Sequence, residues 1–269
     1  MRAALTAEVR KLLTTRMWWI VGLVMVAYLV FMAAVIGFSF GLADGDAEAA
    51  AIVPGGVDAA TSTYSLANPI GYVFPLLVGS MVFTTEFRHK TITGSLLVEP
   101  RRTTLLLAKL VLGVLLGLVY GVVAVASVLL GGAPVLAVVG EGAFLGSGEV
   151  WSVLLWTVVV FAAWSTLGVA FGGLVTNQVA AIVVIVGFTQ FVEPIARAVG
   201  SAIDALSGVA QFLPGAAADA VIGASLFSSF GGAGGTDLLP RWAGLLLLVG
   251  YAAVFAVLAR LVTLRRDIA

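Results

Sequence analysis

The sequence predicts an all-α membrane protein with six transmembrane helices. Hydrophobic residues make up 61% of the 269 residues and charged residues only 10%, whereas soluble domains average about 25% charged residues. Apolar stretches long enough to cross a bilayer as a helix recur six times along the chain. The basic residues between these stretches are distributed asymmetrically, as they are in multi-pass membrane proteins. Lipid is therefore the expected solvent for most of this chain.

The six predicted spans are the stretches that stay apolar over about 17 residues or more. They cover residues 17–42, 68–85, 104–130, 150–171, 178–199 and 239–262. The first follows a basic start, as the apolar region of a signal peptide would, but it is too long for such a region. We interpret it as a retained transmembrane helix. Residues 1–269 are expected to form a single transmembrane domain.

The distribution of basic residues predicts the orientation of the chain. If the N-terminus is cytoplasmic, 12 of the 14 Lys and Arg residues lie on the inner side and two, Arg197 and Arg241, on the outer side. Basic residues in short loops favour the cytoplasmic side. The inner residues are Arg2, Arg10, Lys11, Arg16, Arg88, Lys90, Arg101, Arg102, Lys109, Arg260, Arg265 and Arg266. Six spans then place both termini in the cytoplasm.

The segment before the first span has the pattern of an amphipathic helix. Leu5, Val9 and Leu12 recur at helical spacing, with basic residues on other faces. Such a helix is expected to lie in the interface of the inner leaflet. A frayed, basic terminus is the alternative interpretation.

The outer segments are expected to differ in structure. Residues 43–67 and 131–149 are rich in small residues and predict external loops. Residues 200–237 predict two short outer helices broken at Pro214, followed by a Gly-rich hinge before the last span.

A short charged segment, residues 84–102, interrupts the apolar pattern between the second and third spans. Ile92, Leu96 and Leu97 form an apolar edge in a polar, mostly basic sequence, and Pro100 ends any helix there. A loop that only joined two helices could be much shorter. The segment therefore predicts a short amphipathic helix whose apolar residues enter the interface or a groove on a cytoplasmic partner.

Two rows of glycine predict close helix packing. Gly113, Gly117 and Gly121 recur every fourth residue in the third span, and Gly168 and Gly172 repeat the spacing in the fourth. Glycine at this spacing lets helix backbones approach closely in membranes. A compact bundle is expected, and the rows also suit dimerisation.

Ionisable residues inside the spans are few. Glu193 and Arg197 are four residues apart near the outer end of the fifth span, so we expect an ion pair there; a candidate outer gate is the alternative, because ionisable groups in spans are often functional. Lys109 is expected to extend its amine to the inner surface. The lack of other charges in the spans disfavours transport driven by protons or sodium.

The sequence shows no motif for chemistry on this chain. It has no cysteine and one histidine, so no metal site is predicted, and it has no phosphate-binding Gly-rich loop with Lys. No catalytic residue and no cofactor are expected here. A formal net charge of zero gives no reason to expect nucleic acid. Any energy for transport should come from another subunit.

The segment "TTEFRHKTITGSLLVEPRRTTLLLAKL", residues 84–110, resembles the permease subunits of type-2 ATP-binding-cassette exporters. That family has an E-[FY]-R-x-x-T-[IL] start, then L-L, then Pro with basic residues, then Lys at the head of the next span. The matching residues are Glu86, Phe87, Arg88, Thr91, Ile92, Leu96, Leu97, Pro100, Arg101 and Lys109. "FLPGAAADA", residues 212–220, is a second, weaker similarity.

The resemblance implies a division of labour. Two permease chains, identical or different, would form the pathway in a bacterial plasma membrane, and two cytoplasmic ATPase subunits would hold ATP and Mg²⁺. The charged segment would be the coupling helix that fits into the ATPase. Its expected contact residues are Glu86, Phe87, Arg88, His89, Thr91, Ile92, Leu96, Leu97, Pro100 and Arg101.

Two other functions remain open from the residues alone. A membrane scaffold without transport activity could use the charged segment to bind a cytoplasmic partner. A stand-alone secondary transporter would need no ATPase.

Overall fold

A computed structural model describes residues 1–43, 55–98, 101–139, 142–203, 208–225 and 238–263. The named elements of these residues are all helical. They are α1 (Arg2–Thr14), α2 (Met17–Ala43), α3 (Gly56–Ser65), α4 (Ala67–Gly71), α5 (Val73–Arg88), α6 (Ile92–Val98), α7 (Arg102–Val139), α8 (Gly148–Leu174), α9 (Gln178–Gly187), η1 (Phe188–Val192), α10 (Glu193–Ala202), α12 (Pro214–Ile222), α14 (Arg241–Leu258) and η3 (Ala259–Thr263). The two η elements are π-helical turns that continue α9 and α14.

The structure confirms the prediction of an all-α chain with six membrane spans. Six helical stretches of the described residues are long and apolar enough to cross a bilayer. They are Met17–Phe40, Gly56–Arg88, Arg102–Val139, Gly148–Leu174, Gln178–Gly200 and Arg241–Thr263. The second and third stretches are much longer than the sequence predicted.

The second span begins at Gly56, within a segment that the sequence assigned to an outer loop. Residues 56–67 are helical, and most of their side chains are buried. Their polar side chains bond inside the helix: Thr63 Oγ1 donates to Ala59 O at 2.8 Å, and Ser65 Oγ donates to Ser62 O at 2.9 Å. Because such hydroxyls satisfy themselves on the local backbone, a polar sequence can lie inside the bundle. The loop expected at residues 43–67 is corrected accordingly; residues 44–54 lie outside the described part.

The third span continues to Val139, although glycine and proline predicted a loop from residue 131. Gly131 lies against the backbone of Val30 in α2, where a Cβ atom would overlap the Val30 carbonyl oxygen. Pro134 is inside α7. The small residues that suggested a loop therefore lie where two helices cross, and α7 ends at Val139.

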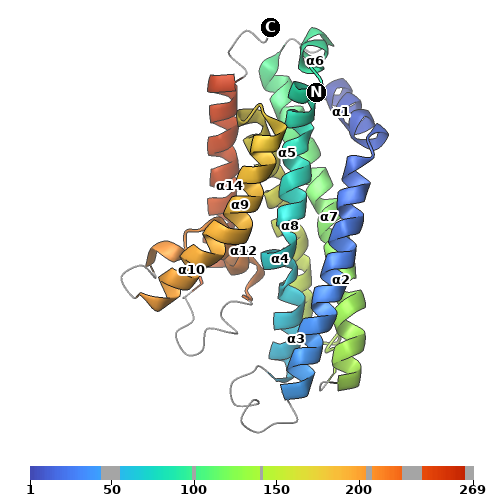
Figure 1. Cartoon of the computed structure of the whole chain (residues 1–269), viewed down its shortest axis with the longest axis vertical. Helices are drawn as coiled ribbons and strands as arrows, with labels where there is room; N and C mark the ends of the chain where they lie inside the picture. Colours follow the sequence, from blue (N-terminus) through green and yellow to red (C-terminus); the bar gives the residue numbers. More distant parts are fainter. Residues whose placement is uncertain (44–54, 99–100, 140–141, 204–207, 226–237, 264–269) are drawn as a thin grey trace.

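The bundle is organised around α8. This helix packs against α7 on one side, α5 on another and α14 on a third, while α2 covers α7. Figure 1 shows α1 and α6 at the same end of the bundle, which we call the α1/α6 end; η3 ends there as well. The bundle's interior is an extended cluster of buried aliphatic and aromatic side chains.

The predicted glycine rows lie at the contacts between these helices. Cβ atoms on Gly113, Gly117 and Gly121 would come within 3.2 Å of Cα atoms of α8. Gly168 and Gly172 of α8 face α5, where added Cβ atoms would overlap the carbonyl oxygens of Leu76 and Ser80. Glycine is needed at these positions because the backbones themselves are in contact.

The segment expected as two outer helices folds back into the bundle. Residues 204–207 and 226–237 lie outside the described part. In the described part, α12 begins at Pro214 and ends at Ile222, and the following Gly223 adopts a left-handed conformation with φ of 82°. Every residue of α12 from Gly215 to Ile222 is buried, and α12 packs against α14. α12 is therefore packed inside the bundle and is not a surface loop helix; its place on the outer side of the membrane stays a prediction.

Candidate functional site

The charged segment forms a helical turn between α5 and α7 at the α1/α6 end (Figure 1). α5 ends at Arg88, and Lys90 turns the chain with φ of 57°. The Thr91 N–H donates to the Glu86 carbonyl at 3.0 Å, which closes this turn. α6 then runs over seven residues, Ile92–Val98. The position and helical form of α6 match the sequence prediction. Some of the residues expected to contact a partner are instead buried within the chain.

Two residues of the segment lie inside the fold, contrary to the partner contact that the sequence suggested for them. Ile92 is 2% exposed and packs in a cluster with Phe83 and Leu105. Glu86 is 7% exposed and belongs to the interior charge cluster described below. Ile92 is the first residue of α6, so its burial fixes the helix to the bundle; it is an anchor, not an exposed contact.

The other expected contact residues occupy the outside of the segment or its edges. Leu97 is 79% exposed, and His89, Thr91 and Arg101 are exposed as well. Arg88 donates from Nη1 to Gln178 Oε1 at 3.2 Å, which joins the end of α5 to the start of α9.

Three of the expected contact residues remain: Phe87, Leu96 and Pro100. The Phe87 ring stacks on Phe83 at 6.4 Å between centroids. The side chain of Leu96 and all of Pro100 lie outside the described part.

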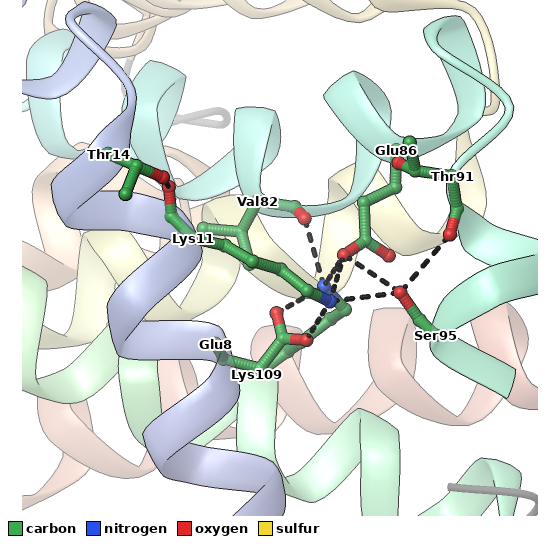
Figure 2. A network of polar contacts seen from close by, with 8 residues as sticks. All are labelled: Glu8, Lys11, Thr14, Val82, Glu86, Thr91, Ser95 and Lys109. Carbon is green, nitrogen blue, oxygen red and sulfur yellow. Dashed lines mark hydrogen bonds and ion pairs between the residues drawn. The ribbon is translucent and has the colours of Figure 1, made fainter. Parts of the chain in front are cut away.

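Glu8, Lys11, Glu86 and Lys109 form a cluster that we call the four-charge cluster (Figure 2). Lys109 Nζ lies 2.5 Å from Glu8 Oε2 and 3.0 Å from Glu86 Oε1. Lys11 Nζ lies 2.6 Å from Glu8 Oε1 and 2.8 Å from the same Glu86 oxygen. Two acids and two bases thus compensate each other at the junction of α1, α5 and α7.

This cluster corrects two expectations. Lys109 does not extend to the surface, because its side chain is 0% exposed and its amine also donates to Val82 O at 3.1 Å. In α1 the most buried residue is the acid Glu8, at 3% exposure. α1 is helical as predicted, but its charged side chains pack it onto α7, so it is not held by leucine contacts alone.

The cluster also reaches α6. Lys11 Nζ donates to Ser95 Oγ at 2.9 Å, and Ser95 Oγ lies 3.3 Å from Glu86 Oε1. Burial opposes the charged form of Lys11, but its hydrogen bonds to Glu8 and Glu86 outweigh this, so the pKa of Lys11 lies above its usual value. A raised lysine pKa stabilises the folded chain at neutral pH, and this contribution is lost only as the pH rises through the folded-state pKa.

A second polar cluster lies deeper in the bundle, around Asp219 of α12. Asp219 accepts hydrogen bonds from Asn68 Nδ2 at 2.6 Å and Ser225 Oγ at 2.7 Å. Arg197 of α10 forms an ion pair with Asp219 at 2.5 Å from Oδ2, the oxygen that also accepts from Ser225. Trp164 Nε1 of α8 donates to Asn68 Oδ1 at 3.2 Å. The cluster therefore joins α12 to α4, α8 and α10.

Glu193 and Arg197 are part of one buried region, but their direct partners differ from those that the sequence predicted. Glu193 accepts from Tyr72 OH at 2.9 Å and from the backbone N–H of Gly215. Arg197 is paired with Asp219. The expected pairing at spacing i, i+4 is therefore replaced by contacts to Tyr72, which joins α4 to α5, and to α12.

The second cluster also changes an expectation about energy coupling. Asp219 is 0% and Glu193 is 2% exposed, so the bundle interior holds two carboxylates. The sequence suggested an interior almost without acids, because Asp219 was placed in an outer segment. Transport driven by protons or sodium is no longer disfavoured on that ground.

Replacing Asp219 with asparagine should loosen α12. The amide oxygen still accepts a hydrogen bond, but the ion pair with Arg197 is lost. We expect the free energy of unfolding to fall by about 3 kcal/mol, the lower end for breaking a buried ion pair, because the Arg197 side chain is 11% exposed. Because the chain has no cysteine, a cysteine at the fully buried Ala218 reports local opening, and its maleimide labelling should be faster in the variant. Asp58→Asn, at an exposed acid of α3, is the matched control and should leave the labelling rate unchanged.

Two of the contacts that sequence reasoning missed join residues that are distant in the chain. Asn68 and Asp219 are 151 residues apart, and Glu8 and Lys109 are 101 apart. A weak signal existed for Glu8, which is an acid in an otherwise basic terminal helix. For Asn68 and Asp219 the sequence offers no local signal.

Six apolar helical spans, with a short helix between the second and third, define a multi-pass membrane protein. The chain matches the family model described as ABC-2 family transporter protein over residues 4–192, which is most of its length. It belongs to this family of membrane transport components, whose members work with an ATPase subunit. No curated protein matches the chain.

Proposed function

We propose that this chain is the permease subunit of an ATP-driven exporter in a bacterial plasma membrane. It would pair with a second permease chain and with a cytoplasmic ATPase that supplies ATP and Mg²⁺. The α1/α6 end would face the cytoplasm, since the described segments that the sequence assigned to the inner side, with Arg10, Arg88 and Arg101 among their basic residues, meet there. An amphiphilic molecule is the class of cargo that suits such a bundle.

The observation that carries the proposal is the combination of an anchored and an exposed residue on α6. Ile92 holds the start of the helix in the bundle at 2% exposure, while Leu97 presents an apolar side chain at 79% exposure. A single exposed leucine is common on protein surfaces; it matters here because members of this chain's family work with an ATPase subunit and α6 is fixed to the bundle by Ile92. A push on α6 would reach α5 and α7 through the chain, and α1 through the Lys11–Ser95 contact.

Leu97→Asp should separate the permease from its ATPase. Burial of an unpaired carboxylate in an apolar groove opposes binding. Loss of an apolar residue at the centre of an interface costs about 2 kcal/mol, or about thirtyfold in affinity. Co-purification of the two subunits from membranes measures the effect. ATP hydrolysis and ATP-dependent export that require both chains would establish the function itself.

The control is Leu97→Met, which keeps the apolar contact and should keep the ATPase bound. Ile92 is unsuitable for the same test, because an aspartate at a buried anchor would disturb the fold as well. If the ATPase remains bound to the Leu97→Asp variant with unchanged affinity, α6 is not the contact.

A stand-alone secondary transporter is the second candidate, and the buried acids Glu193 and Asp219 favour it. Vesicles containing the purified chain without an ATPase distinguish the two. Solute movement driven by a proton gradient alone would support the second candidate, and movement only with ATPase and ATP the first.

A further inference from the structure

A cavity of about 530 Å³ lies at the α1/α6 end, behind α1. Its walls come from α1, the start of α2, α5, α6 and α7. Cavities that bind small molecules in proteins typically measure about 300–1,000 Å³ and are mainly apolar with a few polar groups. This cavity therefore has the size and position of a ligand site within one copy of the chain.

The two ends of the lining differ in chemistry. The apolar wall includes Leu12, Trp18, Met81 and Leu112. The polar part is formed by Lys11, Glu86, His89 and Ser95, at the junction with α6. A lining that is apolar along one part and charged at the other suits an amphiphile, with its chain along α2, α5 and α7 and its head toward α6.

Two buried polar atoms in this lining have no hydrogen-bond partner among the described residues. They are Glu86 Oε2 and Trp18 Nε1. The other carboxylate oxygen of Glu86 accepts from both lysines of the four-charge cluster. A buried carboxylate oxygen without a donor is unfavourable, since its hydration is lost and nothing replaces it. A ligand that donates a hydrogen bond to Glu86 would remove this deficit.

From the cavity and these unpartnered atoms, we propose that it binds an amphiphile with an ammonium head. The head donates to Glu86, and the hydrocarbon chain lies against Trp18 and Met81. The four-charge cluster is balanced without a ligand, so the preference comes from the unpartnered oxygen of Glu86. A carboxylate head has no proton to donate to this oxygen at neutral pH, whereas an ammonium donates a charge-assisted hydrogen bond to it. The site does not depend on ATP or on the direction of transport.

Quenching of Trp18 fluorescence tests the proposal. The purified chain is placed in phosphatidylcholine nanodiscs and titrated with 11-bromoundecylammonium, whose bromine quenches a nearby indole. The difference between the native chain and Trp18→Phe isolates the signal of Trp18 from the other five tryptophans. We expect saturable quenching that dodecylammonium reverses. Dodecanoate should compete about tenfold less well, because its head cannot donate to Glu86.

A phenylalanine that fills the cavity can be compared with a phenylalanine outside it on the same helix. Ala7 lines the cavity from α1, whereas Ala3 is exposed on the same helix and does not. Ala7→Phe should abolish the Trp18-specific quenching, and Ala3→Phe should leave it unchanged. Glu86→Gln should remove the preference for dodecylammonium over dodecanoate, and the Ala7 pair decides the outcome if the Glu86 variant does not fold.

The outcomes separate clearly. Quenching that survives Ala7→Phe, or equal competition by dodecanoate and dodecylammonium, overturns the proposal. Phosphatidylethanolamine added to the nanodisc identifies the source of the ammonium: competition points to a bilayer lipid, and its absence points to free single-chain amines. Both results uphold the ammonium site.

Discussion

Replacing Lys109 with methionine is expected to lower the free energy of unfolding by about 3–5 kcal/mol, the usual cost of removing one partner from a buried ion pair. The amine of Lys109 lies between Glu8 and Glu86, and the Lys109 side chain is 0% exposed. Methionine fills the space but leaves two acids with one lysine. Thermal unfolding in detergent measures the loss.

The same variant should release α1 before the bundle unfolds. Glu8 would retain only Lys11, which is 44% exposed at its side chain. A single cysteine at Ala7, in a chain with no other cysteine, should therefore react faster with maleimide. The double variant Glu8→Leu with Lys109→Met leaves Lys11 paired with Glu86 and should recover part of the stability. If the double variant loses as much as the sum of the two single variants, the pair does not act as a unit.

Gly168→Leu should separate α8 from α5 and cost about 3 kcal/mol or more of the free energy of unfolding. A Cβ atom at Gly168 would overlap the carbonyl oxygen of Leu76. Overpacking typically costs about 1–3 kcal/mol and occasionally more; the upper end applies here because the obstacle is backbone, which has no rotamer to change. Unfolding in increasing sodium dodecyl sulfate measures it.

Gly250→Leu is the matched control for this helix contact. Gly250 lies within α14, and no atom lies within 4 Å of the place where its Cβ atom would stand. Both variants gain the same helix propensity, about 0.8 kcal/mol, so the difference between them reports packing alone. Equal stability of the two variants would mean that the α5–α8 contact at Gly168 does not limit the bundle.

The extent of the helices was predictable only where hydropathy alone decides it. The fourth and fifth spans were predicted within a few residues of the observed Gly148–Leu174 and Gln178–Gly200. The second and third spans were not predicted to their full length. In the second, serine and threonine side chains that bond to their own helix resemble a loop sequence. In the third, glycine residues at a helix crossing do the same. The helical end of the third span becomes intelligible once Gly131 is seen against Val30.

The candidate contact on α6 was predictable as an element but not residue by residue. The sequence located a short helix between two spans, yet it could not distinguish Ile92, which faces the bundle, from Leu97, which faces outward. A helix of seven residues has too few turns for its periodicity to define a face without its neighbours.

By itself, the sequence determined that this chain is a six-span helical membrane protein with a short helix between spans two and three, because burial in lipid depends on the local density of apolar side chains. Only the tertiary structure decided the partners of the charges: Lys109 with Glu8 and Glu86, and Asp219 with Asn68 and Arg197. The physical reason is that a polar contact in a bundle depends on which helix faces meet, and those helices can be 22 residues apart in the chain, as for Arg197 and Asp219, or 151, as for Asn68 and Asp219.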